Sequence, residues 1–141
     1  MIALRLVVDT NVLVSAALKS EGLPRTVLTI ALTRPARFYV SQPILDEYAE
    51  VLARPALGIS KSARLKLLQQ IRNHSFLVAP ARCLDATGDP DDSIFVECAD
   101  AARADYLITG NRRHFPSFWK GTKIISAREF IALAAPHLLG R

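Results

Sequence analysis

The chain has 141 residues, half of them hydrophobic, and it carries a formal net charge of +5. This length predicts one domain over residues 1–141 with a core of its own, and the apolar content excludes a disordered chain. Arg5, Asp9 and Asn11 interrupt the apolar residues 2–18 and so exclude a membrane span or secretory signal there, while the positive charge favours a polyanionic partner such as nucleic acid.

The spacing of apolar residues predicts strands and helices that alternate along the chain. In order, we expect a strand at 4–8, helices at 11–19 and 24–33, a strand at 37–40, helices at 42–53 and 61–73, a strand at 75–78, a loop from Arg82 to Pro90, a helix at 92–103, strands at 106–108 and 123–125, and a helix at 127–135. This alternation predicts an α/β layer fold with a parallel sheet. Cys83 and Cys98 form no CxxC pair and are expected as free thiols of a cytoplasmic protein.

Asp9 comes directly after the first predicted strand, whose residues are almost all branched and apolar. In open α/β sheets, ligands bind outside the carboxyl ends of the strands, so a carboxylate at this position suggests phosphate or metal chemistry. The alternative is that Asp9 only caps the helix that follows.

Glu47 lies in the helix predicted after the second strand. An apolar face made of Ile44, Leu45, Tyr48, Val51 and Leu52 follows from the helical period of this segment. Asp46 and Glu50 point away from that face toward water, and Glu47 lies at its border. A carboxylate at the border can reach a cleft beside the sheet, although a plain surface position is the alternative.

Two further polar groups follow later elements. Asp89, Asp91 and Asp92 crowd the start of a helix, where one acid is needed as a cap. Asn111 lies in a small polar turn after the strand at 106–108.

Asp9, Glu47, Asp92 and Asn111 are therefore expected to form a cluster at one edge of the sheet. Two carboxylates about 5 Å apart repel by roughly 3 kcal/mol at an effective dielectric near 20, and no Lys or Arg lies close in sequence to them. A hard divalent cation would offset this repulsion, and carboxylate and amide oxygens suit Mg²⁺ or Mn²⁺. The three histidines have no metal-ligand spacing, and no Walker loop or GxGxxG motif is present.

Taken together, these segments resemble the PIN-domain family, in particular the VapC-like ribonuclease toxins of type II toxin–antitoxin pairs. The matching pieces are Val7–Ala16, Glu47 after the second strand, Asp92 with the following Phe95 and Ala99, and Leu107–Asn111 with His114 and Phe115. The resemblance implies a parallel five-stranded sheet flanked by helices and Mg²⁺- or Mn²⁺-dependent hydrolysis of RNA. It also implies a homodimer and a cognate antitoxin.

Carried over by motif, Asp9 and Asp92 would hold metal, Glu47 would help directly or through water, and Asn111 would complete the catalytic pocket. Many relatives have Asp where this chain has Asn111, which leaves one or two metals open. The register among Asp89, Asp91 and Asp92 also stays open, with Asp92 favoured by the apolar spacing that follows it.

Several other polar residues are candidates for RNA contact. Thr10 and Asn11 begin the first helix, where their N–H groups or side chains can steady Asp9 or a phosphate. Arg112 and Arg113 follow Asn111 and could hold RNA phosphates. Two basic groups on predicted surfaces support nucleic-acid contact, namely Lys61, Arg64, Lys66 and Arg72 and, later in the chain, Arg112, Arg113, Lys120 and Lys123.

Two rival functions use the same fold. A non-catalytic PIN-like module would bind nucleic acid or a protein partner, but the retained Asp9, Glu47 and Asp92 argue against it. A phosphotransferase with Asp9 as nucleophile, as in haloacid-dehalogenase-like enzymes, needs a second Asp two residues on, where this chain has Asn11.

Overall fold

A computed structural model describes residues 3–81 and 88–139. The strands are β1 (Arg5–Val8), β2 (Arg37–Val40), β3 (Ser75–Leu77), β4 (Tyr106–Ile108), β5 (Phe118–Trp119) and β6 (Thr122–Ile125). The α-helices are α1 (Thr10–Leu18), α2 (Leu23–Ala31), α3 (Gln42–Leu52), α4 (Lys61–His74), α5 (Pro90–Ala102) and α6 (Ala127–Ala134), with short 3-10 turns at Pro55–Leu57, Arg112–His114 and Pro136–Leu138.

The strands form one sheet in the order β3-β2-β1-β4-β6-β5. β1, β2, β3, β4 and β6 run parallel, and β5 pairs antiparallel with β6. The α/β fold with a mainly parallel sheet is thus confirmed, and five strands run parallel as expected, but the sheet has six strands rather than five because β5 adds an antiparallel edge strand. β5 has two residues, too few to show a strand period, and a two-residue turn at Lys120 and Gly121 joins it to β6.

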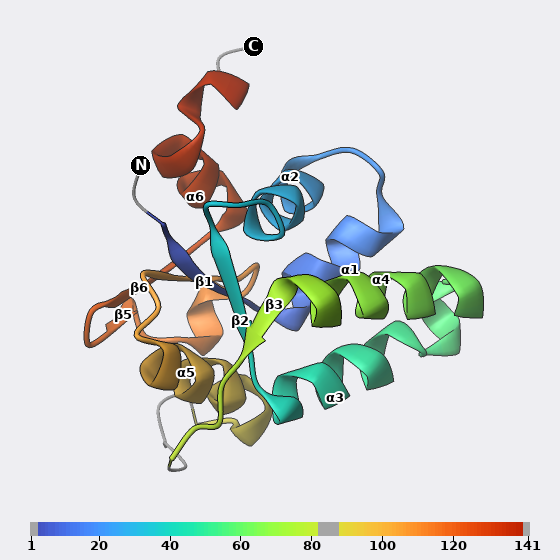
Figure 1. Cartoon of the computed structure of the whole chain (residues 1–141), viewed down its shortest axis with the longest axis horizontal. Helices are drawn as coiled ribbons and strands as arrows, with labels where there is room; N and C mark the ends of the chain where they lie inside the picture. Colours follow the sequence, from blue (N-terminus) through green and yellow to red (C-terminus); the bar gives the residue numbers. More distant parts are fainter. Residues whose placement is uncertain (1–2, 82–87, 140–141) are drawn as a thin grey trace.

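The central strands are apolar because both of their faces are covered. α5 packs against β1, β2 and β4, while α6 contacts β4 and α2, which in turn packs on α1. Figure 1 shows α5 and α6 on opposite sides of β1. The largest fully buried side chains include Phe38, Tyr48, Phe95 and Phe130, one from each of four elements.

Short polar residues begin several helices as predicted. The side chains of Ser41, Ser60 and Ser126 accept hydrogen bonds from the first turns of α3, α4 and α6, and Ser126 with Glu129 completes a capping box. α5 begins two residues earlier than expected because Asp89 is its N-cap. Most of the predicted loop from Arg82 to Pro90 lies outside the described residues, and so does Cys83. Cys98 is a buried free thiol.

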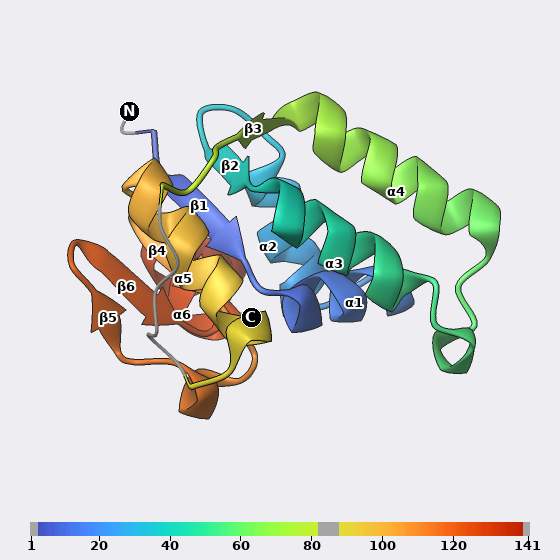
Figure 2. The same ribbon diagram turned by 90° about the horizontal axis from the view of Figure 1, so that it is seen from below.

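α3 and α4 lie side by side beyond the sheet, and α3 also contacts α1 and α5 (Figure 2). This places α3 next to the point where β1 ends and α1 begins. Within the described residues, no helix combines the length and apolar character needed to cross a bilayer.

Candidate active site

Asp9 stands where β1 ends and α1 begins. Its N–H donates to the carbonyl of Ile108 in β4 at 2.9 Å, so the backbone stays tied to the sheet at this point. Its side chain is 4% exposed and makes no capping hydrogen bond to α1. Its Oδ2 instead accepts a hydrogen bond of 2.7 Å from the Thr109 hydroxyl. Asp9 thus occupies the N-cap position of α1, but its carboxylate is held at the end of β4, so capping by this side chain is not its role.

Thr109 links two segments that are 100 residues apart. It is fully buried, donates to Asp9, and accepts the N–H of Asn111 at 2.9 Å. One hydroxyl thus fixes both the Asp9 carboxylate and the turn that carries Asn111. Sequence reasoning did not single out Thr109, although it stands inside the Leu107–Asn111 segment that was used.

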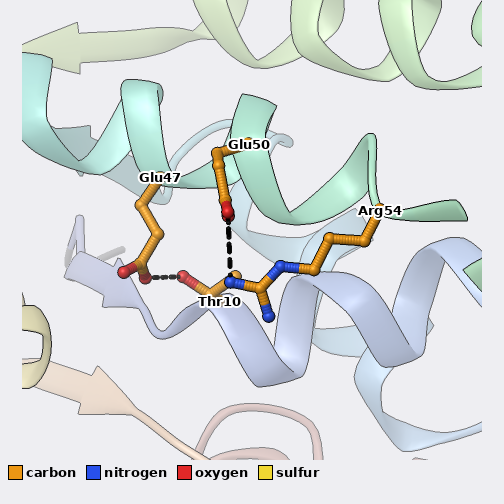
Figure 3. A network of polar contacts seen from close by, with 4 residues as sticks. All are labelled: Thr10, Glu47, Glu50 and Arg54. Atoms are coloured by element: carbon orange, nitrogen blue, oxygen red, sulfur yellow. Dashed lines mark hydrogen bonds and ion pairs between the residues drawn. The ribbon is translucent and has the colours of Figure 1, made fainter. Parts of the chain in front are cut away.

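Glu47 reaches the same region from α3. Its carboxylate accepts a hydrogen bond from the hydroxyl of Thr10 at the start of α1 (Figure 3). The next residue, Tyr48, is fully buried and donates its hydroxyl to the Val8 carbonyl at the end of β1. These two bonds hold α3 against the end of β1 and set Glu47 beside Asp9.

The predicted phase of this helix is confirmed by side-chain exposure. Glu47 is half-buried, whereas Asp46 and Glu50 are exposed. Asp46 accepts from Gln42, and Glu50 pairs with Arg54 at 3.0 Å, a contact also drawn in Figure 3.

Asp92 is the acid of the Asp89–Asp92 run that faces the interior. Asp89 accepts the Asp91 N–H as the cap of α5, and Asp91 is exposed. Asp92 is half-buried, and its Oδ2 lies 3.4 Å from Nδ1 of His114. The structure therefore separates a capping acid, a solvent-facing acid and an inward acid, and it adds His114, which the sequence had offered only as part of a motif.

Burial raises the pKa of the Asp9, Glu47 and Asp92 carboxyls above their ordinary values, and burial is the largest cause in each case. Repulsion raises two of these pKa values further, since the charge of Asp92 acts on Asp9 and both act on Glu47. The Asp92 pKa is instead raised further by the charges of Asp89 and Asp91. The neighbouring charge that opposes this at Asp9 and Asp92 is His114. The cluster is a region of negative charge that the described residues leave largely unbalanced.

This donor set fits a hard cation that keeps part of its water shell. Within 3–81 and 88–139, no three His, Cys, Asp or Glu side chains are grouped so as to hold one ion together. Mg²⁺ is usually held by one or two carboxylates with several waters, so a site of this kind needs no larger protein cage. Asp9 and Asp92 supply the carboxylate oxygens that such a site needs.

A hollow of about 490 Å³ adjoins the site on the side of α1 and α6. Its lining includes Asn11, Thr109, Asn111 and Arg128, so Asn11 and Asn111 share one concave surface. The hydroxyl of Thr10 is bound to Glu47 and the residue is buried, which makes Thr10 a support of the acidic cluster.

The two arginines after Asn111 differ in their surroundings. Arg112 forms an ion pair of 2.8 Å with Glu129 at the start of α6. Arg113 is exposed on the same short turn.

The chain is similar to known proteins in family, in sequence and in fold. A family model described as "PIN domain" matches residues 5–113. The chain is 28% identical over 114 residues to the uncharacterized protein MJ1680 of Methanocaldococcus jannaschii, a match that covers 79% of this chain and 73% of that protein. A chain in the crystal structure of VapBC2 from Rickettsia felis, bound to a DNA fragment from their promoter, superposes with a TM-score of 0.59 at 15% identity, over 87% of this chain and 98% of that chain. At this identity the structural match shows a shared fold.

Proposed function

The chain belongs to the PIN domain family, and from this premise we propose that it is a divalent-metal-dependent ribonuclease that hydrolyses RNA phosphodiester bonds. PIN domains are in general nucleases. The observation that carries the proposal is the convergence of Asp9, Glu47 and Asp92, three carboxylates with raised pKa values, at the carboxyl ends of the strands. Helix capping does not account for these side chains, since the Asp9 carboxylate makes no cap hydrogen bond to α1 and Asp89, not Asp92, caps α5.

In this proposal Asp9 and Asp92 would hold Mg²⁺ or Mn²⁺, and Asn111 would complete the pocket. The bound cation supplies charge neutralisation at the scissile phosphate and a lower pKa for a water molecule. The Thr109 hydroxyl fixes the orientation of the Asp9 carboxylate that would bind the cation. Glu47, oriented by Thr10, accepts a proton from the attacking water.

RNA approaches this site along a basic surface. Asn11 lies in the hollow beside Asn111, and Arg113 projects from the turn after it. Arg112 joins them in holding phosphate if its ion pair with the exposed Glu129 opens, which costs little because both partners are solvated.

A matched pair of neighbouring acids tests the ribonuclease proposal. Asp92→Asn and Asp91→Asn make the same chemical change one residue apart, one facing inward and one facing solvent. We expect Asp92→Asn to lose cleavage of a mixed RNA pool with Mg²⁺ or Mn²⁺, and Asp91→Asn to retain it within about twofold. Equal activity in both variants, or no cleavage by the wild type, would leave the non-catalytic PIN-like module as the better account.

We further propose that the protein is the toxin of a toxin–antitoxin pair, a cytoplasmic homodimer that a cognate antitoxin protein blocks. This proposal is supported by the fold shared with a chain of VapBC2 and by the sequence motif Val7–Ala16. Induced expression of the wild type should arrest growth, and Asp92→Asn should not. Co-expression of a short neighbouring open reading frame should restore growth. Size-exclusion chromatography with light scattering measures the molar mass and so tests whether the protein is a dimer.

A further inference from the structure

A second hollow lies at the opposite end of the strands from the acidic cluster of Asp9, Glu47 and Asp92. It has a volume of about 650 Å³ and is formed where β2 and β3 begin and α4 ends. The side chains that matter are Arg34, Arg37, Asn73, His74, Ser75 and Phe76. We call it the basic hollow. Strands of this length separate it from the acidic site by about 13 Å or more, so the two are distinct.

The basic hollow collects cations without matching acids. No carboxylate is present among its lining residues as described. The ion pairs found in the described part of the chain leave out Arg34 and Arg37, and both side chains are exposed. The negative end of the α4 dipole points here, but its half charge is smaller than that of two guanidinium groups. An anion is therefore attracted to this surface.

An aromatic ring stands within the same hollow. Phe76 is 47% exposed although Tyr39 packs against it with ring centroids 5.4 Å apart. The guanidinium of Arg37 lies 5.6 Å from the Phe76 ring centre, and a stacked guanidinium keeps its N–H groups free for a phosphate. Exposed aromatic rings and guanidinium planes are the surfaces on which bases of single-stranded RNA stack.

A further polar group is left with a free donor. The Asn73 side-chain oxygen accepts from Gln69 at 3.0 Å, which leaves its NH₂ group to donate. A volume of this size is within the range of small-ligand sites. Anion-binding side chains beside a half-exposed ring describe a ligand with a phosphate and a flat base.

We propose that the basic hollow binds a nucleotide, with Arg34 and Arg37 on the phosphate and Phe76 stacked on the base. The nucleotide comes either from the pool of free mononucleotides or from the phosphorylated end of an RNA strand. Both sources present the same chemistry to the hollow. This assignment stands apart from the ribonuclease proposal, because it uses none of the acidic residues.

The test is a calorimetric titration with adenosine 5′-monophosphate in excess chelator, so that no nucleotide is held through a metal at the acidic site. We expect saturable binding to the wild type and at least tenfold weaker binding to Arg34→Gln/Arg37→Gln. Arg72→Gln removes an exposed charge from the same neighbourhood without lining the hollow, and it should bind within twofold of the wild type. Phe76→Leu should lower the affinity to that of inorganic phosphate, with Arg34→Gln as a second test if Phe76→Leu does not fold.

Three results overturn the proposal: no saturable binding, equal binding by the double variant, or loss of binding in Asp92→Asn. A parallel titration with a 5′-phosphorylated RNA pentamer separates the two sources. Binding at least tenfold tighter than that of the mononucleotide identifies an RNA end as the ligand, and equal binding identifies a mononucleotide. Because these titrations contain no metal and measure no cleavage, failure of the ribonuclease proposal would not affect them.

Discussion

Asp9 shows how a single buried charge links stability to pH. Its carboxyl pKa in the folded protein is raised by burial, so between its ordinary value and the raised one the folded chain holds a proton that the unfolded chain has released. The stability contributed by that proton is lost as pH rises through this window. Above this window, the ionised Asp9 therefore destabilises the metal-free fold.

We expect Asp9→Asn to be at least as stable as the wild type at pH 8 in chelator, because the amide carries no charge and its oxygen still accepts from Thr109. RNA cleavage should fall by at least a hundredfold, about 2.7 kcal/mol of transition-state stabilisation. Thermal melts at pH 8 and pH 4 test the first part, and the stability difference should shrink at pH 4. A variant that melts well below the wild type at both pH values would restore a structural role for Asp9.

Thr109 is predicted to be the partner on which Asp9 depends. Thr109→Val keeps the shape but removes the donor to a buried carboxylate and the acceptor of the Asn111 N–H. We expect a loss of about 1–3 kcal/mol in the free energy of unfolding at pH 7 and at least tenfold slower cleavage. Urea denaturation measures the first quantity, and Thr109→Ser, which retains the hydroxyl, should behave like the wild type.

At this scale, sequence reasoning reached the residues whose chemistry shows in their type. Asp9, Glu47 and Asp92 are acids at the ends or borders of predicted elements, and the structure brings their charges within range of one another. Thr109, His114 and the Tyr48 hydroxyl act through contacts across 22 to 100 residues. Nothing local marks such residues, since their partners are known only once the sheet is assembled.

Among the elements, α3 permits the sharpest test because it carries three acids that face different directions. Glu47→Gln should slow cleavage at least tenfold, while Asp46→Ala and Glu50→Ala should change it less than twofold. The exposed Glu50–Arg54 pair is an i,i+4 contact, so its loss should alter the unfolding free energy by no more than about 0.5 kcal/mol. Single-turnover cleavage rates decide this prediction, and equal losses in all three variants would contradict the placement of Glu47.

The elements that the sequence predicted well are those with a long period or a clear cap. α3, α4 and α6 begin where their serine caps stand. β5 was missed, since its pairing depends on β6 and on Lys120, which adopts a left-handed conformation with φ of 51°. Two residues give no alternation to recognise, and only the tertiary contact defines the strand.

For the molecule as a whole, metal binding and folding should be nearly independent. A core drawn from the sheet and from the helices that cover it holds the fold. The acidic site, in contrast, offers few ligands to a cation. We expect excess chelator to abolish cleavage while leaving the circular dichroism spectrum unchanged. Mg²⁺ at ten times its dissociation constant should stabilise the protein by only about 1.4 kcal/mol. Cleavage that persists in chelator would exclude the metal-dependent mechanism.

The hydrogen bond between Asp9 and Thr109 also sets the earliest point during biosynthesis at which the site can form. The two residues are 100 positions apart, and at about 5–20 residues per second a ribosome needs roughly 5–20 s to pass from one to the other. During that interval the emerging Asp9 has neither β4 beside it nor the Thr109 hydroxyl, and for most of it Asp92 has not been made. A translation product that stops before residue 109 therefore cannot assemble the acidic cluster. If the protein is the proposed ribonuclease, an interrupted nascent chain would not cleave the messenger RNA on which it is being made.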